Sequence, residues 1–270
     1  MKNIPKIFKL FDLTGRNIII TGSSGTLGSQ YADTLSQAGA NVILVDINGK
    51  NNNLEKTLRK KYKTNAKFYC ADISIEKNVL SLKKNILTDF KKIDGLINNA
   101  AYTNIDAIKN SDNISAPFEK FSFQLWKKII DVNLSGVFNC CKVFGSQMVK
   151  QRKGTIVNIS SIAGVKGIGS SIAYAASKGA LNTMTVSMAR NLGPIRVNAI
   201  CPGFIEGEWL KKGMGPEVYE ATKSHIENTA PLKKTCTPES ISEVIFSLID
   251  NSSLVTGQII TVDGGVSLNL

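Results

Sequence analysis

The chain has 270 residues, of which 43% are hydrophobic, and it carries a formal net charge of +12. This length suits one α/β domain that needs no disulfides, and the absence of a run of about 18 apolar residues argues against a membrane span. The basic residues are spread as short Lys and Arg groups on expected helix faces with no recognition module beside them, so we expect no nucleic-acid binding.

The cysteines and the single histidine argue against disulfide or metal chemistry. The cysteines are odd in number and lack CxxC spacing, so we expect reduced, mostly buried thiols and no metal site. They are Cys70, Cys140, Cys141, Cys201 and Cys236. His225 is the single histidine and lies in a polar stretch, so a Ser-His-Asp triad that does not use His225 is excluded. The start of the chain lacks the apolar core of a signal peptide, so we expect a cytoplasmic protein.

Short continuous apolar runs alternate with longer helical stretches along the chain. Seven runs are predicted as strands: 17–21, 42–46, 67–71, 95–98, 155–160, 196–200 and 258–262. Helices are predicted over 26–38 and 54–62. Continuous apolar strands are typical of a sheet covered on both faces. The alternation therefore predicts an α/β fold with a doubly wound, seven-stranded parallel sheet flanked by helices.

No repeat, linker or composition break divides the chain, so we expect one domain over residues 1–270. Two segments are less regular. Residues 103–117 are polar and end in proline, which predicts a loop. Residues 203–230 mix glycines and prolines with a short apolar helix, which predicts a lid over a substrate pocket.

A glycine-rich stretch, Thr21 to Gly28, joins the first strand to the first helix. Glycine lets the backbone turn tightly and approach a pyrophosphate, and the helix N-terminus offers free N–H groups to the phosphates. Asp46 closes the second strand 18 residues after Gly28 and has no arginine beside it. An aspartate there accepts both ribose hydroxyls and repels a 2′-phosphate, so we predict NAD rather than NADP.

Tyr174 and Lys178 are four residues apart in a stretch predicted to be helical, so their side chains share one face. A free tyrosine has a pKa of about 10, which is too high for efficient proton exchange at neutral pH. A nearby ammonium favours the phenolate, so we expect Lys178 to lower the pKa of Tyr174.

Taken together with the other motifs, the Tyr174–Lys178 pair makes the sequence resemble the short-chain dehydrogenase/reductase family. The resemblance covers nearly the whole chain. The resemblance implies a Rossmann-type fold, with Tyr174 as acid/base and Lys178 holding the nicotinamide ribose. It also implies that Ser161, 13 residues before Tyr174, binds the substrate oxygen in preference to Ser160. Asn133, in Asp-Val-Asn-Leu, matches the asparagine that holds a proton-relay water.

The resemblance also implies a set of cofactor-binding residues. They are Gly22, Ser24, Gly25, Leu27, Gly28, Asp46, Asp72, Ile73, Asn99, Tyr174, Lys178, Pro202, Gly203 and Ile205. Asn98-Asn99-Ala100 is similar to the motif that stabilises the central sheet, and Val262 to Gly265 resembles the last strand and its exit.

Three positions depart from the family pattern. Thr26 stands where Gly or Ala is usual, which resembles the family's extended epimerase and dehydratase branch. The chain lacks that branch's large C-terminal region, so it is placed in the compact branch. Ala101 replaces a usual glycine. Gly207 replaces a threonine that often binds the nicotinamide amide, so a backbone group or a neighbouring side chain must supply that contact.

These observations predict an oxidoreductase that interconverts a secondary alcohol and a ketone with NAD. Two alternatives stay open: a non-catalytic NAD(H)-binding sensor, and an NAD-dependent epimerase or dehydratase that returns the hydride to its substrate. We expect a small-molecule substrate and a homodimer or homotetramer, built through helices around 127–149 and 172–191. The residues expected to line the substrate pocket are Tyr102, Val165, Ile168, Trp209 and Met214.

Overall fold

A computed structural model describes residues 11–49, 52–103, 105–106, 117–167, 170–249 and 254–269. Seven parallel strands form one sheet in the order β3-β2-β1-β4-β5-β6-β7. Their bounds are β1 Asn17–Thr21, β2 Asn41–Asp46, β3 Ala66–Cys70, β4 Gly95–Asn98, β5 Thr155–Ile159, β6 Arg196–Pro202 and β7 Ile259–Val262. The chain order reverses between β1 and β4, which is where open α/β sheets bind ligands. The predicted fold class is confirmed.

The longer helices are α2 Thr26–Gln37, α3 Asn52–Tyr62, α4 Glu76–Phe90, α6 Phe123–Ile130, α10 Ile172–Asn191, α12 Pro216–Thr229 and α13 Pro238–Ile249. The shorter ones are α7 Val137–Cys140, α8 Ser146–Gln151, α9 Ala163–Lys166 and α11 Glu208–Met214. Two π-helical segments, η2 Asp131–Gly136 and η3 Cys141–Gly145, interrupt the helix that runs from α6 to α8. Two 3₁₀ turns, η1 Phe118–Lys120 and η4 Val266–Asn269, complete the described elements.

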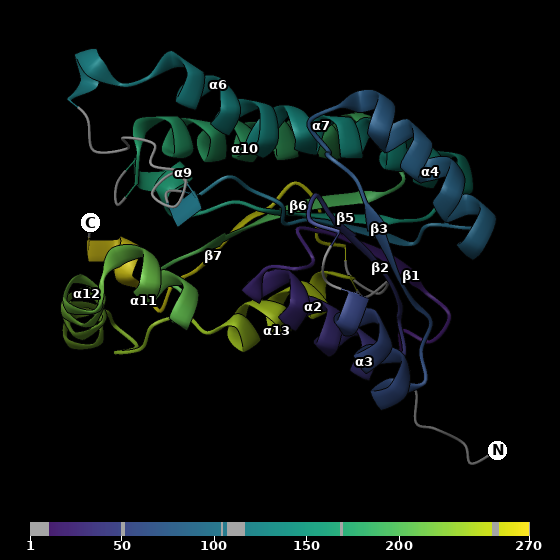
Figure 1. Cartoon of the computed structure of the whole chain (residues 1–270), viewed down its shortest axis with the longest axis horizontal. Helices are drawn as coiled ribbons and strands as arrows, with labels where there is room; N and C mark the ends of the chain where they lie inside the picture. The colour runs from purple at the N-terminus through teal and green to yellow at the C-terminus, as the bar shows by residue number, and fades with distance from the viewer. Residues whose placement is uncertain are drawn as a thin grey trace.

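The helices form one layer on each face of the sheet (Figure 1). On one face, α2 covers β1 and β2 while α13 covers β5 and β6, and Ile18, Leu44 and Ile245 share a fully buried core there. On the other face, α4, α7, α8 and α10 cover β1, β4 and β5 around a second core that includes Ile19 and Phe144. None of the described helices is long and apolar enough to cross a membrane.

The predicted bounds of the first and fourth strands match the observed ones, and those of the other five differ by one or two residues. The third strand begins at Ala66, because this buried residue pairs with Val42 of β2. The sixth strand continues to Pro202, because β7 pairs with it as far as Val262. Of the predicted loop over 103–117, residues 104 and 107–116 lie outside the described part of the chain.

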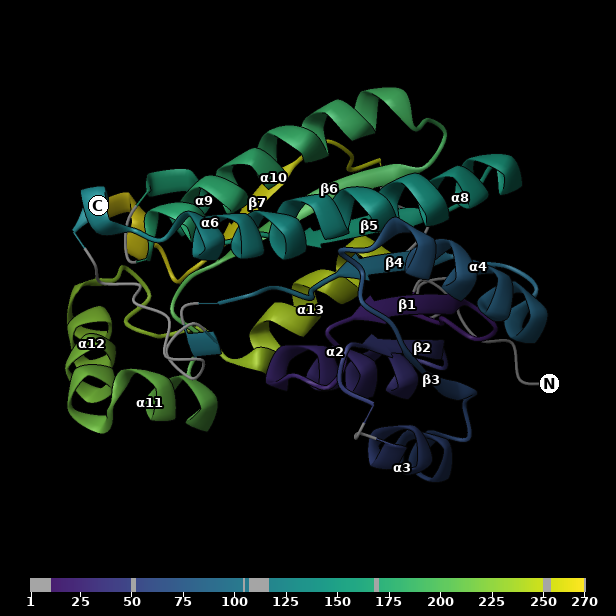
Figure 2. The same ribbon diagram turned by 45° about the horizontal axis from the view of Figure 1, so that its top comes forward.

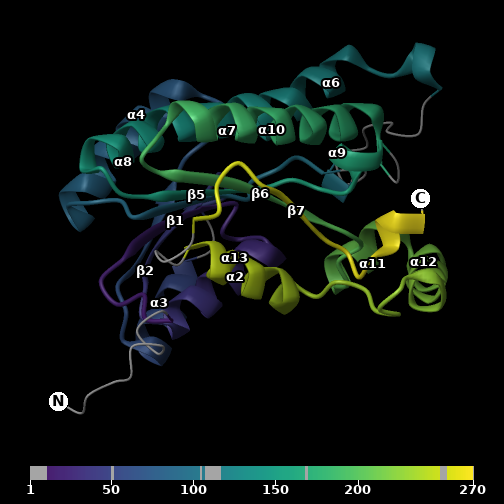
Figure 3. The ribbon, with the colours of Figure 1, turned by 180° about the vertical axis from the view of Figure 1, so that it is seen from behind.

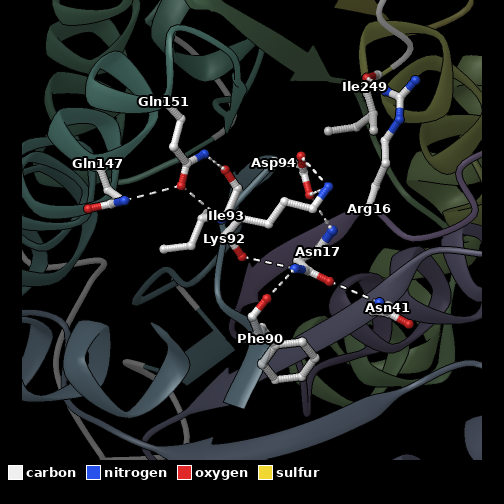
Figure 4. A network of polar contacts seen from close by, with 10 residues as sticks. All are labelled: Arg16, Asn17, Asn41, Phe90, Lys92, Ile93, Asp94, Gln147, Gln151 and Ile249. Carbon is white, nitrogen blue, oxygen red and sulfur yellow. Dashed lines mark hydrogen bonds and ion pairs between the residues drawn. The ribbon is translucent and has the colours of Figure 1, made fainter. Parts of the chain in front are cut away.

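A network of polar contacts ties the amino ends of the central strands together (Figure 4). The side chain of Asn17 donates to the carbonyls of Phe90 and Lys92 and accepts from the Asn41 amide. The Asp94 carboxylate accepts from the Asn17 backbone N–H at 2.9 Å. These contacts hold β1, β2 and the start of β4 in register at this end, so the opposite, carboxyl end of the sheet is free for ligand binding.

Helices α11 and α12 project beyond the carboxyl ends of the strands (Figures 2 and 3). They follow β6 through a segment in which Ile205 pairs with Cys236 in a parallel bridge. Helix α11 packs on the loop after β4: a Cβ added to Gly213 would lie 2.1 Å from Cδ1 of Ile105. The two helices and their connecting residues thus occupy the place expected for the lid segment 203–230.

Candidate active site

The glycine-rich loop lies against the turn after β4. Gly22 has a φ of +66°, and a Cβ there would lie 2.8 Å from Cα of Ala100. A Cβ on Gly28 would lie 2.2 Å from the carbonyl oxygen of Gly22. Both positions therefore require glycine, because any side chain would force the turn open. The loop turns directly from β1 into α2, as predicted.

The first turn of α2 presents donors without side-chain caps. Gly25 is the N-cap residue and provides no side-chain hydrogen bond to the helix. The hydroxyls of Ser23 and Ser24 are buried, and neither has a hydrogen-bond partner among the described residues. Free helix N–H groups and orphaned hydroxyls are what a dinucleotide pyrophosphate needs, so the loop fits that group. Leu27, in the first turn of α2, is partly buried and packs on the apolar core.

Asp46 lies at the carboxyl end of β2, beside this loop. One carboxylate oxygen accepts from the Ser24 N–H at 3.0 Å, and the other accepts from the Asn48 N–H at 3.1 Å. The residue that follows, Ile47, is exposed, and Asn48 and Gly49 come next. None of the residues described in this turn, 47–49, is cationic, which fits a ribose diol better than a 2′-phosphate.

Two of the expected cofactor contacts, Asp72 and Ile73, follow β3. Asp72 accepts from the backbone N–H and the hydroxyl of Ser74 through one carboxylate oxygen. Ile73 is buried, and the Asn139 amide holds its carbonyl at 3.1 Å. The Asn139 contact fixes the Asp72–Ile73 backbone at the edge of the site and was not anticipated from the sequence.

Asn99 fixes the loop from the other side. Its amide donates to the carbonyls of Thr21 and Gly22 at 3.1 Å each. The Thr21 hydroxyl accepts from the Asn99 and Ala100 backbone N–H groups. β1 and β4 are therefore locked together at the point where the chain order reverses.

Three more of the expected cofactor contacts, Pro202, Gly203 and Ile205, lie at the end of β6 and in the turn after it. Pro202 ends the strand, and a Cβ added to Gly203 would lie 2.7 Å from Cβ of Asp263. The Gly203 N–H donates to the Val262 carbonyl at 2.9 Å. Ile205 is buried where the chain turns toward α11. The close approach of the two backbones explains the glycine.

The predicted catalytic side chains meet at the carboxyl ends of β5 and β6. Tyr174 and Lys178 lie one turn apart on α10, with the Lys178 ammonium 5.5 Å from the centre of the Tyr174 ring. Lys178 is 3% exposed and donates to the carbonyl of Ile159 at 2.7 Å. The Ser161 side chain is hydrogen-bonded to the Tyr174 hydroxyl.

Ser160 and Ser161 have different surroundings. The Ser160 hydroxyl is buried and donates to the carbonyl of Lys178 at 3.1 Å. Ser161 is partly exposed beside the tyrosine hydroxyl. Only Ser161 is therefore positioned to contact a substrate oxygen, in line with the 13-residue spacing.

Burial dominates the proton affinities of this pair. Burial raises the pKa of Tyr174 to about 12, and the hydrogen bond with Ser161 offsets only part of that rise. Burial lowers the pKa of Lys178 to about 8. The expectation that Lys178 brings the pKa of Tyr174 below its usual value is thus not met in this structure, because burial raises that pKa and the group that lowers it is Ser161.

Asn133 lies in the π-helical segment η2 and is fully buried. Its Oδ1 accepts from the Tyr102 N–H at 2.6 Å, and its Nδ2 donates to the Tyr102 carbonyl and the Ser177 hydroxyl. The Ser177 hydroxyl donates in turn to the Tyr174 carbonyl at 2.7 Å. The side chain thus joins three elements of the site, and the proton-relay water that the resemblance implies would have to use the backbone of this residue.

Sequence reasoning missed several residues of the site. Asp106 contributes a negative charge that raises the pKa of Tyr174. Asn158 bridges Asn98 and Thr185 beneath the site through buried hydrogen bonds. Of the expected pocket residues, Ile168 lies outside the described part of the chain and Val165 is 48% exposed, whereas Tyr102, Trp209 and Met214 are partly buried. An isolated Asp in a polar loop gives no sequence signal, because its role depends on how the loop folds.

Known proteins are similar to this chain in sequence and in fold. Residues 22–267 match the family model described as enoyl-(acyl carrier protein) reductase. The 3-oxoacyl-(acyl-carrier-protein) reductase of Thermotoga maritima is 34% identical over 94% of this chain and 98% of its own length. The protein of the same name from Chlamydia trachomatis is 31% identical over the same shares.

Solved structures agree with these relatives. The crystal structure of NAD⁺-bound xylitol dehydrogenase is 29% identical, has a TM-score of 0.83 and matches over 94% of this chain and 99% of its own. The matches extend through the glycine-rich loop, the Tyr174–Lys178 helix and the turn after β6. They support an oxidoreductase with a nicotinamide nucleotide as cofactor. The chain is therefore a member of the short-chain dehydrogenase/reductase family.

Proposed function

We propose that this protein interconverts a secondary alcohol and a ketone by hydride transfer, with NAD as cofactor and Tyr174 as the acid/base. The observation that carries the proposal is the meeting of the Tyr174 hydroxyl, Ser161 and Lys178 in one place. We expect the cofactor to lie between this trio and the glycine-rich loop. When bound, the nicotinamide supplies or accepts the hydride.

The chain's own residues account for the proton chemistry. Tyr174 is a neutral phenol at pH 7, because its pKa is about 12. It is therefore ready to donate its proton to the oxygen of a ketone. In the opposite direction, the phenolate accepts the proton of the alcohol, so oxidation is favoured as the pH rises. Ser161 donates to the substrate oxygen, where negative charge develops during reduction.

Lys178 acts as a charge at the base of the site. The hydrogen bond from Lys178 Nζ to the carbonyl of Ile159 fixes the ammonium near the Tyr174 ring. An ammonium there stabilises the Tyr174 phenolate whenever it forms, even though burial keeps the Tyr174 phenol neutral before the reaction. The remaining donors of the ammonium are positioned to hold a ribose hydroxyl.

We further propose that the active form is a homodimer or homotetramer. Phe118 is 76% exposed, Phe123 is 72% exposed and Ile172 is 50% exposed, and all three lie on or beside α6 and α10. These helices cover one side of the molecule next to each other (Figure 2). A second copy that packs the same surface would bury these side chains with closed symmetry. Light scattering at micromolar concentration should give a multiple of the 29.2 kDa chain mass, and a monomer would contradict the proposal.

A substrate screen separates this proposal from its two alternatives. The protein is incubated with NAD⁺ and a panel of secondary alcohols, and with NADH and the matching ketones, while the absorbance of NADH is followed. Stoichiometric formation or loss of NADH supports the alcohol–ketone reaction. Conversion of a sugar nucleotide without net NADH would favour the epimerase or dehydratase alternative, and tight NADH binding with no conversion would favour the sensor.

A further inference from the structure

The side-chain amide of Asn139 holds the turn that joins β3 to α4. Its Nδ2 donates to the carbonyl of Ile73 at 3.1 Å and to the carbonyl of Ser74 at 3.2 Å. Asn139 lies in α7 and is partly buried. Because one amide binds two consecutive carbonyls, the turn cannot shift without losing a hydrogen bond.

The same face of this helix contacts the turn a second time. Gly136 lies three residues before Asn139, so the two positions share one helix face. A Cβ added to Gly136 would lie 2.9 Å from Cγ1 of Ile73. The glycine thus allows the helix to approach the buried Ile73 closely. An apolar contact and two hydrogen bonds together fix the turn on the helix.

The fixed turn adjoins the expected ribose site. The Ala71 N–H donates to the carbonyl of Asp46 at 2.9 Å, and the Asp46 carboxylate accepts from the Ser24 N–H of the glycine-rich loop. The next residue, Asp72, is partly exposed, so a ligand can reach it. Ser74 donates twice to Oδ1 of Asp72, at 2.9 Å and 2.7 Å. In the described part of the chain, Oδ2 has no hydrogen-bond partner, so it is left to accept from a ligand.

We propose that Asn139 is a positioning residue for the adenine of the cofactor. By fixing the carbonyls of Ile73 and Ser74, it aims the second carboxylate oxygen of Asp72 at the exocyclic amino group of the base. The inference rests on the proposed cofactor site and adds a residue that acts on the cofactor only through this turn. A carboxylate is an acceptor only, so it selects an amino group over a carbonyl at that edge of the base.

A pair of cofactors that differ at this edge tests the proposal without any need for turnover. Reduced nicotinamide hypoxanthine dinucleotide carries a carbonyl where NADH has the amino group of adenine. Calorimetry gives the Kd of each compound. The parent protein should bind NADH about twofold to tenfold more tightly, the range of one ordinary hydrogen bond. Asn139→Ala frees the turn, so it should weaken NADH binding and bring the two constants close together.

Two further variants make the test specific. Asn17→Ala is the matched control, because Asn17 also donates to two backbone carbonyls, those of Phe90 and Lys92, at the amino end of the sheet. It should lower stability and keep the parent's preference for NADH. Asn139→Asp keeps the size of the side chain but replaces the donor with an oxygen that repels both carbonyls. It should reduce the preference at least as far as Asn139→Ala, and it decides the question if the alanine variant does not fold.

The outcomes separate this inference from the proposed function. If the parent prefers NADH and the folded Asn139 variants keep that preference, Asn139 is only structural, and the inference is overturned while the cofactor site stands. If the parent binds both compounds equally, Asp72 does not select the amino group, and the inference is overturned in the same way. If the folded parent binds neither compound, the proposed cofactor site itself is overturned, and the role of Asn139 with it.

Discussion

Asn133 holds both backbone polar groups of Tyr102. Its Oδ1 accepts from the Tyr102 N–H at 2.6 Å, and its Nδ2 donates to the Tyr102 carbonyl at 3.1 Å. The same Nδ2 donates to Ser177, which caps the carbonyl of Tyr174. One buried amide therefore fixes the loop after β4 relative to the helix that carries the acid/base.

Replacing Asn133 with alanine should damage catalysis as well as stability. The substitution removes the side-chain amide that bonds both backbone groups of Tyr102, which should lower the free energy of unfolding by about 1–3 kcal/mol. Misplacement of the loop and of Tyr174 should lower turnover by about 10- to 100-fold. Asn17→Ala is the control, because Asn17 makes similar buried contacts at the amino end of the sheet. It should lower stability but keep the turnover of the folded enzyme, and equal turnover in both variants would show that Asn133 is only structural.

The sequence predicts the sheet and the site motifs well because each depends on local pattern. Continuous apolar runs mark the buried strands, and Gly28 is required by a backbone clash with Gly22 within one turn. The pKa of Tyr174 could not be predicted in this way, because it depends on how completely distant segments bury the phenol. The links from Asn133 to Tyr102 and Ser177 span 31 and 44 residues, and such pairings leave no periodic signal in one sequence.

Burial is the main cause of the raised pKa of Tyr174, and the charge of Asp106 should add a smaller rise. Its negative charge raises the pKa of Tyr174, so Asp106→Asn should lower that pKa and increase the phenolate fraction at a given pH. In the alcohol-oxidising direction, the rise of rate with pH should therefore move to lower pH. The control Asp89→Asn changes a carboxylate that contacts Lys67 and Tyr69 at the edge strand, and it should leave the profile in place. A shift of the Asp106→Asn profile to higher pH would contradict this electrostatic account.

The buried ammonium of Lys178 should make stability depend on pH. Burial lowers its pKa to about 8 in the folded protein, against 10.5 without burial, so the charged form is disfavoured by folding. The resulting decrease in the free energy of unfolding is largest below pH 8. It disappears as the pH rises from about 8 to 10.5. Chemical denaturation of the parent and of Lys178→Met should show the parent gaining stability relative to the variant across that window. A constant difference between the two proteins would mean that Lys178 is not desolvated.

Asp46 should set the preference for NAD(H). Its carboxylate lies where the adenosine ribose is expected and would repel a 2′-phosphate. The Kd for NADH should therefore be lower than that for NADPH at equal ionic strength, and Asp46→Ala should narrow the gap. Asp72→Ala, which removes a carboxylate bonded to Ser74 instead, should leave the ratio of the two constants unchanged. Tighter binding of NADPH by the parent protein would contradict the assignment.

The turnover of Tyr174→Phe tests the central claim most directly, because this substitution removes only the hydroxyl that is bonded to Ser161. With a substrate found in the screen, turnover should fall by about two to four orders of magnitude, the contribution of a positioned acid/base. The Kd for NADH should stay close to that of the parent, because the phosphate loop and Asp46 are unchanged. Turnover near the parent rate, in a variant that folds and binds NADH normally, would show that Tyr174 is not the acid/base.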